Sequence, residues 1–169
     1  MISQNLRFLI RLGAMMDINK FSIGATAAIT TSMGLIAGLA HGESARISII
    51  TGLLVIAVAD NISDSLGIHI YKESEGASKA DIRSSTFGNF SVRLLLALTF
   101  VLIVLLLPSR LALILSSIWG LVLLAVLSYL IAQRKKTRPF YEIAWHLAVA
   151  LFVIAVSKIM GDLILSRLN

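Results

Sequence analysis

The 169-residue sequence has no cysteine and few charged residues, and both absences narrow what the protein can be. Without cysteine there is no disulfide, no thiolate metal site and no thiol nucleophile. Only 14% of the residues are charged while 57% are apolar, and the mean hydropathy is +0.90. Soluble domains are about one quarter charged, and a soluble chain of this length could not bury so much apolar surface in one core. The composition therefore indicates an integral, multi-pass membrane protein.

The excess of positive charge does not indicate a nucleic-acid partner. The net charge is +6 at pH 7, but the basic residues lie in short stretches between apolar runs. The sequence also shows no nucleophile–base pair, no set of spaced histidines that could bind a metal and no nucleotide-binding loop. We therefore expect a protein of the lipid bilayer that is not an enzyme and has no permanently bound cofactor.

Five apolar runs are long enough to cross the hydrocarbon layer, which takes about 20 residues as a helix. They predict an all-α fold, a single membrane domain, with transmembrane helices over residues 22–40, 47–70, 92–107, 111–132 and 143–165. Residues 1–21 have an amphipathic pattern that predicts a helix lying in the membrane interface, with an ordinary terminal segment as the alternative. Residues 71–91 are predicted to form a short cytoplasmic segment.

Lysine and arginine are unevenly divided between the two sides of these spans. With the N-terminus in the cytoplasm, all but four of the 15 basic residues lie on the cytoplasmic side, and the exceptions are Arg46, Arg110, Lys158 and Arg167. Cytoplasmic loops carry the excess of Lys and Arg in membrane proteins. The bias predicts a cytoplasmic N-terminus, in the inner membrane of a prokaryotic cell or otherwise in an organelle membrane.

The first span is rich in glycine and alanine, and Gly34 and Gly38 form a GxxxG pair. Small residues at this spacing let another helix approach the backbone closely. We therefore expect this helix to pack at the centre of the bundle, and we predict a homodimer whose axis is lined by the first two spans.

The second span carries two aspartates within an apolar run. Asp60 lies near its centre and Asp64 one turn later, so both carboxylates share one helix face. Two negative charges at mid-membrane are costly unless a proton or a cation lies between them, and such residues usually mark an ion or proton pathway. Because the span itself has no basic residue to neutralise them, we predict that the pair holds protons or a divalent cation. The alternative is that each aspartate only hydrogen-bonds to neighbouring helices.

Other polar residues are candidates for the same path. Asn61 follows Asp60 directly, and hydroxyl groups of the first span could supply oxygen ligands from Thr26, Thr30 and Thr31. These hydroxyls could equally bond to carbonyls of their own helix. Glu75, beyond the end of the second span, is a further candidate metal ligand, with a plain solvated surface as the alternative.

Two motifs in these spans can be compared with a known family. The first span reads ATAAITTSMGLIAGLA, and the second contains ADNISDSLG followed by Ser74 and Glu75. They resemble the DGIVTTLGLVAGL-type first helix and the ADALSMAIG of the second helix, also followed by SE, in the vacuolar iron transporter family. The resemblance implies a homodimer that exchanges ferrous or similar divalent ions for protons at a site built from the first two helices, with Asp60 as a transport-site aspartate.

Three departures from the family pattern change the expected site. The family's first-helix aspartate falls on Ala27, its second-helix methionine falls on Asp64, and its long cytoplasmic metal-binding helices are reduced to the stretch Tyr71–Phe90. One carboxylate is lost and one appears, so the charge is unchanged while the ligands become harder. Hard oxygen ligands suit Mg, Ca and Mn better than softer metals.

The leading hypothesis is a transporter of divalent cations, iron or manganese, which exchanges them with protons through Asp60 and Asp64. One alternative is a proton-coupled carrier of another small solute on the same scaffold. The other is a membrane interaction or assembly subunit that keeps the fold without transport. Ala27 and the short cytoplasmic segment favour the subunit, whereas two acids at mid-membrane favour transport.

Overall fold

The computed structural model describes residues 18–40 and 44–168, and over these residues the chain is helical without any strand. The elements in chain order are α2 (Ile18–Gly38), α3 (Ala45–Val55), the π-helical turn η1 (Ile56–Asp60), α4 (Asn61–Ser74), α5 (Lys79–Leu106), α6 (Ser109–Lys135) and α7 (Pro139–Leu168). Because η1 joins α3 to α4 without a break, these three form one continuous helical rod. An interfacial helix was predicted over residues 1–21. Residues 1–17 lie outside the described part of the chain, and from Ile18 onward the chain belongs to α2.

The turns between the long helices follow from local chemistry. Gly76 has a positive φ of 69° between α4 and α5, a conformation that glycine adopts without a steric penalty. The Ser78 hydroxyl then accepts a hydrogen bond from the Asp81 backbone N–H at 3.2 Å and caps the start of α5. Pro108 separates α5 from α6, and Pro139 opens α7, where its missing N–H is not needed.

Within the described residues, five helical runs are long and apolar enough to cross a membrane: Phe21–Gly38, Ala45–Ser74, Lys79–Leu106, Arg110–Lys135 and Pro139–Arg167. This is the number that the sequence predicts, but one boundary is wrong. Helix α5 begins at Lys79, well before residue 92, so residues 71–91 are the end of α4, a short turn and the first half of α5. Arg93, counted above among the cytoplasmic charges, consequently lies midway along α5.

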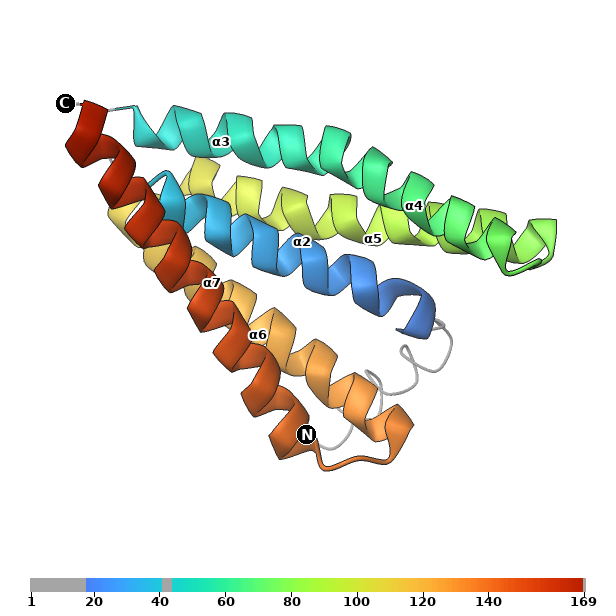
Figure 1. Ribbon diagram of the computed structural model, residues 1–169. Helices are drawn as coiled ribbons and strands as arrows, with labels where there is room; N and C mark the ends of the chain where they lie inside the picture. The colour runs from blue at the N-terminus through green and yellow to red at the C-terminus, as the bar shows by residue number, and fades with distance from the viewer. Residues whose placement is uncertain (1–17, 41–43, 169) are drawn as a thin grey trace.

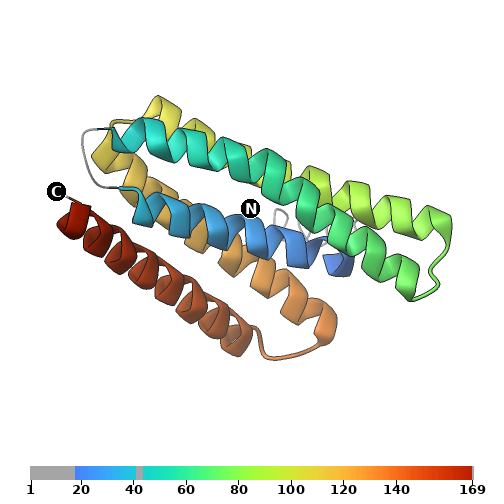
Figure 2. The ribbon, with the colours of Figure 1, turned by 45° about the horizontal axis from the view of Figure 1, so that its top comes forward.

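Helix α2 lies between two pairs of helices. It contacts α5 on one side and both α6 and α7 on the other, while α4 packs along α5 and α7 packs along α6. Figure 1 shows that the two pairs converge at one end and splay apart at the other, and Figure 2 shows the same arrangement after rotation. The splayed end, with the α4–α5 and α6–α7 turns, is called the wide end below. The end with the α5–α6 turn and the C-terminal end of α7 is called the narrow end.

The packed core is centred on α2. Ile29, Met33 and Ile36 of this helix are almost completely buried, and they pack with residues such as Leu53 of α3 and Phe100 of α5. Helix α7 is the opposite case, because large apolar side chains are exposed along its length, among them Phe152, Ile159 and Ile164. Exposed apolar surface of this extent marks contact with lipid or with another protein.

The GxxxG pair of α2 packs against α7 of the same chain. A Cβ at Gly34 would lie 2.9 Å from Val153 Cγ1, and one at Gly38 would lie 3.2 Å from the Ser157 carbonyl oxygen. On the facing helix, a Cβ at Gly161 would clash with the carbonyl of Gly38. These glycines therefore bring α2 and α7 together within one chain, and they do not form the surface on which a second copy was predicted to pack.

Candidate functional site

Two acidic side chains and one basic side chain meet where α4 packs on α5. Arg93 forms ion pairs with both aspartates: its Nη1 lies 3.1 Å from Asp64 Oδ2, and its Nη2 contacts Asp60 Oδ2. The Arg93 side chain is only 4% exposed, whereas the side chains of Asp60 and Asp64 are 48% and 36% exposed. The cluster therefore has a buried cation at its base and two partly exposed carboxylates at its mouth.

Amide and hydroxyl groups connect this cluster to the core. Asn89 of α5 donates from Nδ2 to Asp64 Oδ2 and to Ser65 Oγ, each at 3.2 Å. Ser65 Oγ in turn lies 3.5 Å from Asn61 Oδ1, and the Asn61 amide donates to the Phe90 carbonyl at 2.9 Å. Asn61, Ser65 and Asn89 are all buried, so hydrogen bonds shielded from water tie α4 to α5.

The π-helical turn η1 ends at Asp60 and changes the hydrogen bonding of the next residue. The backbone N–H of Asn61 bonds to the carbonyl of Ile56, five residues earlier. The Ala57 carbonyl, which a regular helix would pair with that N–H, lies 3.3 Å from the Asn61 side-chain Nδ2 instead. Single π turns inside α-helices are frequent at functional sites, and here the turn places Asp60 directly after the irregularity.

Helix α2 closes the cluster from the inside through Gly24. A Cβ at this position would clash with Asn89 Oδ1 and would lie 3.1 Å from Arg93 Cγ, so only glycine lets α2 come this close. Among the described residues, Arg93 Nε and Asn89 Oδ1 are buried without a hydrogen-bond partner. The cluster thus keeps one buried donor and one buried acceptor beyond the bonds it makes.

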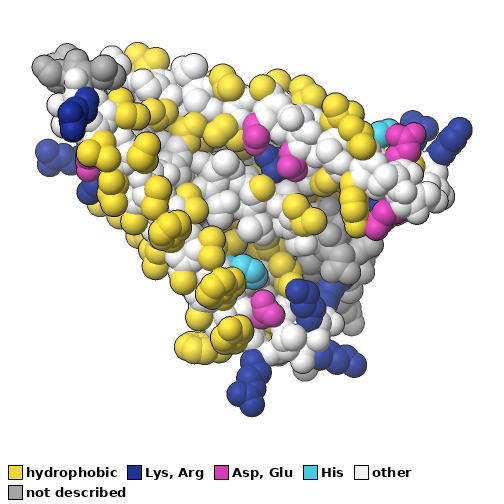
Figure 3. Space-filling view, viewed as in Figure 1, with side chains coloured by type: hydrophobic (Ala, Val, Ile, Leu, Met, Phe, Trp, Pro, Cys, Tyr) yellow, Lys and Arg dark blue, Asp and Glu magenta, His cyan; other side chains and the backbone are white. Residues whose placement is uncertain are grey.

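The carboxylates open onto an uncovered strip that runs from the end of η1 along α4. It is called the carboxylate strip below and is formed by Asp60, Ser63, Asp64 and Gly67. Ser63 is exposed, and a Cβ at Gly67 would meet no atom within 4 Å. Figure 3 shows acidic side chains at the surface midway along this side of the molecule, with basic atoms between them. Since Asp60 lies midway along the apolar run Ala45–Ser74, these charges sit far from either end of the helix.

Two of the candidate threonines of the first span use their hydroxyl groups within α2. Thr30 donates to the Thr26 carbonyl at 2.8 Å, and Thr31 donates to the Ala27 carbonyl. The hydroxyls of Thr30 and Thr31 therefore follow the second of the two alternatives, bonding within their own helix. Asn61 likewise holds α4 against α5 through its hydrogen bond to the Phe90 carbonyl, instead of adding an oxygen ligand beside the carboxylates.

Glu75 is also separated from the two aspartates. It lies past the end of α4, about 16 Å along the helix axis from Asp64 at the usual rise per residue. There the Tyr71 hydroxyl donates to Glu75 Oε1 at 2.7 Å. The structure thus does not place Glu75 in one metal site with Asp60 and Asp64.

Arg93 and Asn89 are the site residues that sequence reasoning missed. The aspartates were expected to lack a basic partner because their own span has none, but Arg93 reaches both from a neighbouring helix. A usable signal was the spacing of Ser85, Asn89 and Arg93, which recur every four residues and so share one helix face. All three are buried. Treating the apolar run as starting at residue 92 hid this polar face.

The charges and donors of the site limit what one chain can bind. Two carboxylates and one guanidinium leave a net charge of −1, and a guanidinium cannot ligate a cation. Over residues 18–40 and 44–168 there is no group of three or more His, Asp or Glu side chains that could hold a metal ion. A hard divalent cation usually takes six or more oxygen ligands, so water or a second chain would have to supply the rest.

Comparisons with protein-family models, with curated proteins and with solved structures found no match to this chain.

Proposed function

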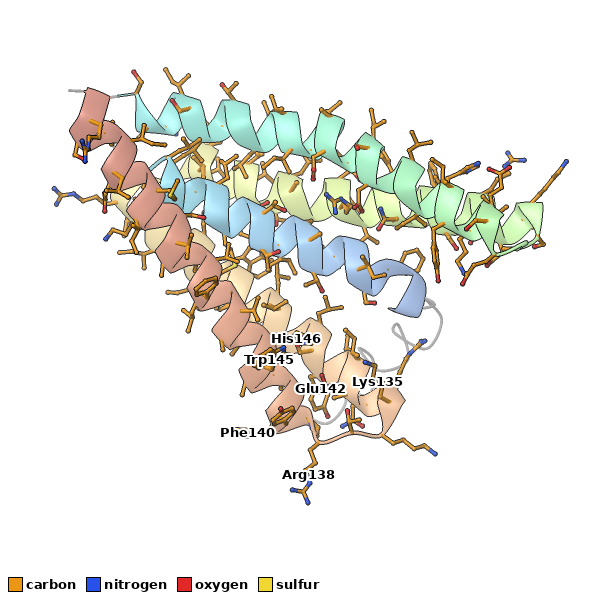
Figure 4. The ribbon with its side chains drawn as sticks, in the orientation of Figure 1. Lys135, Arg138, Phe140, Glu142, Trp145 and His146 are labelled. Atoms are coloured by element: carbon orange, nitrogen blue, oxygen red, sulfur yellow. The ribbon has the colours of Figure 1, made fainter. Side chains whose placement is uncertain are left out.

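We propose that the chain is an integral, multi-pass membrane protein with its wide end, and hence its N-terminus, in the cytoplasm. Five long apolar helices support insertion. The basic residues Lys135 and Arg138 lie at the α6–α7 turn of the wide end, and Phe140 and Trp145 follow within the first two turns of α7 (Figure 4). The two aromatic side chains are 85% and 62% exposed. Exposed aromatic rings beside basic residues are typical of a membrane–water interface, and basic residues of its cytoplasmic side.

Two single-cysteine variants test this orientation. Ser44 precedes α3 at the narrow end and Ser78 precedes α5 at the wide end, and both are exposed. A membrane-impermeant maleimide added to intact cells should label Ser44→Cys, and it should label Ser78→Cys only after the membrane is opened. The unaltered chain has no cysteine and is the unlabelled control. The reverse pattern, or equal labelling of both variants in intact cells, would contradict a cytoplasmic N-terminus.

We propose further that the protein transports cations, with Asp60 and Asp64 as the binding groups. The observation that carries this proposal is their partial exposure midway along an apolar helix. A charged side chain at the centre of a bilayer costs at least about 2.5 kcal/mol on insertion scales. These carboxylates therefore need to face water, a cation or another protein. Intramembrane acids in such positions commonly belong to ion or proton pathways.

The proposed protein partner is a second copy of the chain. The carboxylate strip consists of small and polar residues, which let a facing helix approach closely. A two-fold axis along this strip would bring the two carboxylate pairs together, because a symmetric interface places the same residues on both sides. The expected homodimer thus keeps the second span at its axis, while Gly34 and Gly38 are already used within the chain.

The proposed cargo is a divalent metal ion, iron or manganese, exchanged for protons. Carboxylate oxygens suit Mn²⁺ and similar hard ions better than they suit softer metals. The motifs of the first two helices add support through their resemblance to the vacuolar iron transporter family. A proton and a metal ion compete for the same carboxylate oxygens, and this competition is the physical basis of exchange.

Uptake into proteoliposomes tests this proposal. Vesicles that contain the purified chain and a pH-sensitive dye should take up Mn²⁺ or Fe²⁺ while protons move in the opposite direction, and empty vesicles should not. Zn²⁺ should enter more slowly than either ion because the site offers no soft ligand. Vesicles that contain folded protein and yet take up no divalent cation, at either sign of the proton gradient, would contradict the proposed cargo.

A second candidate function is a membrane assembly subunit without transport, and the ion pairs of Arg93 favour it. A guanidinium that contacts both carboxylates can neutralise much of their charge without any cargo. Such a subunit would need the cluster only for folding or association. It would show no uptake in the same vesicles, while loss of the carboxylate strip would change its oligomeric state.

A further inference from the structure

We propose that a groove between α4 and α5 binds an anionic phospholipid, with one acyl chain along the groove and the lipid phosphate held at its outer end by Arg83. The inference rests on the proposed insertion into a membrane and does not depend on cation transport. It concerns the α4–α5 pair at the wide end and uses none of the three charged side chains of the cluster described above.

The groove lies on the other side of α4 from the carboxylate strip. Ile62, Leu66 and His69 recur at spacings of three and four residues, so they share one face of the helix. At about 100° of rotation per residue, this face points away from Asp60 and Asp64. Occupation of the groove therefore need not disturb the two carboxylates.

The walls of the groove are apolar at one end and polar at the other. Its volume is about 520 Å³, within the usual range for a ligand site. Ile62 and Leu66 of α4 face Phe87 and Phe90 of α5 at the deeper end, and three of these four are more than half exposed. The opposite end is lined by His69, Thr86 and Arg83, and there Thr86 Oγ1 lies 3.4 Å from His69 Nδ1.

The length of α5 places these two ends at different depths in a bilayer. Helix α5 has 28 residues and is about 42 Å long, which matches a bilayer of about 40–45 Å including its headgroups. Arg83 lies about 6 Å from the start of the helix, at the level of the headgroups. Phe90 lies about 10 Å deeper, among the acyl chains. The groove thus runs in the direction of a lipid chain, with its basic end at the height of a lipid phosphate.

The charge at the outer end favours an anion. Arg83 is exposed and forms no ion pair within residues 18–40 and 44–168. Two nearby acids have other partners: Asp81 pairs with Lys72 at 3.4 Å, and Glu75 accepts a hydrogen bond from the Tyr71 hydroxyl. A guanidinium binds phosphate oxygens with two parallel hydrogen bonds. Basic pockets between membrane helices on the cytoplasmic side are typical sites for anionic lipid headgroups.

A second copy of the chain fits this face less well than a lipid does. A two-fold axis along the groove would bring the two Arg83 side chains to the same depth, because a symmetric interface repeats each residue on both sides. Their like charges would then repel each other at the membrane surface. The deeper wall also consists of large side chains, whereas helices that pack closely in membranes use small ones.

Photo-crosslinking in vesicles tests the proposal. The purified full chain is placed in phosphatidylcholine vesicles with a trace of a lipid that carries a diazirine in one acyl chain. The headgroup of this probe is either phosphatidylglycerol or phosphatidylcholine, and the labelled residues are mapped by mass spectrometry. The phosphatidylglycerol probe should label Leu66 and Phe87 roughly tenfold more than the phosphatidylcholine probe does, because only the anionic headgroup leaves Arg83 fully neutralised.

Two pairs of variants separate headgroup recognition from chain binding. Arg83→Gln should reduce labelling by the anionic probe to the level of the other probe. Its matched control is Lys79→Gln, since Lys79 is exposed one turn earlier on α5 and does not line the groove. Leu66→Trp should fill the groove and reduce labelling of Phe87 by both probes. Ile70→Trp is its control, because Ile70 is exposed on α4 outside the groove.

Each other result has a definite meaning. Equal labelling by both probes in the wild type, or a preference that survives Arg83→Gln, would overturn the proposal. Displacement of the anionic probe by soluble glycerol phosphate would show a site for free phosphate and overturn it as well. Cross-links between two copies through Leu66 or Phe87 would assign the groove to a second chain. Labelling by neither probe at any residue would contradict membrane insertion itself, whereas absence of cation uptake would leave all these expectations unchanged.

Discussion

Vesicles that contain the triple variant Asp60→Asn/Asp64→Asn/Arg93→Gln should take up no Mn²⁺ above the level of empty vesicles. The two carboxylates are the anionic groups of the cluster, and asparagine keeps their size while removing the charge that attracts a cation. Metal-driven proton movement should disappear with uptake, because the same oxygens are proposed to carry both. The expected effect is complete loss, larger than that of any other change considered.

Removal of Arg93 in this variant is part of the design. Asp60→Asn/Asp64→Asn alone would leave a buried guanidinium without a counter-ion, and truncating one side of a buried ion pair destabilises a protein by about 3–5 kcal/mol. A loss of uptake could then reflect misfolding. The triple variant is neutral, and neutral replacements of a complete buried ion pair are often tolerated. Glu142→Gln at the α6–α7 turn is the matched carboxylate control and should transport normally. Uptake that survives in the folded triple variant would place the site elsewhere.

The single variant Arg93→Gln should lower the free energy of unfolding by up to about 3 kcal/mol in metal-free detergent solution, since the two carboxylates left behind are partly exposed. The reason is that Asp60 and Asp64 lose their counter-ion and repel each other across one helical turn. For a chain of this size, a loss of about 3 kcal/mol corresponds to a melting temperature lower by roughly 6–12 °C. Folded proteins are usually stable by about 5–15 kcal/mol, so the variant should still fold. Thermal unfolding followed by tryptophan fluorescence measures the change.

Two further measurements identify the cause of this destabilisation. The triple variant should recover to within about 1 kcal/mol of the wild type, because it removes all three charges together. Added Mn²⁺ should also stabilise Arg93→Gln more than the wild type, since a ligand that binds only the folded state raises its stability. If Arg93→Gln is as stable as the wild type without metal, the ion pairs do not contribute as the structure indicates.

The two aspartates show how far local sequence information reaches. Their position in the middle of an apolar run, and their place on one helix face, follow from spacing alone. Their counter-ion does not, because Arg93 is 33 residues from Asp60 and 29 from Asp64 along the chain. When hydropathy is averaged along the sequence, an arginine beside an apolar run is assigned to the boundary of a membrane span. Only the packing of α4 on α5 shows that it is buried.

The glycines of α2 show the same limit of local sequence information for the choice of the helix that packs against them. Gly34 and Gly38 predicted a close helix contact, since the absence of a Cβ is a property of the residue itself. Whether the contacting helix belongs to the same chain or to a second copy depends on which surface is complementary. Gly161 on α7 provides that surface, and nothing in the spacing of α2 could indicate it.

The sequence by itself determined that the chain is all-helical over the described residues, with five apolar runs long enough to cross a membrane, and that two acids lie within one of them. These properties depend on the period, length and hydropathy of single segments, which are local. The tertiary structure decided which polar groups meet: Arg93 with Asp60 and Asp64, and the hydroxyls of Thr30 and Thr31 with their own helix. Pairing between helices depends on their relative register and rotation, and these are set by packing over the whole bundle.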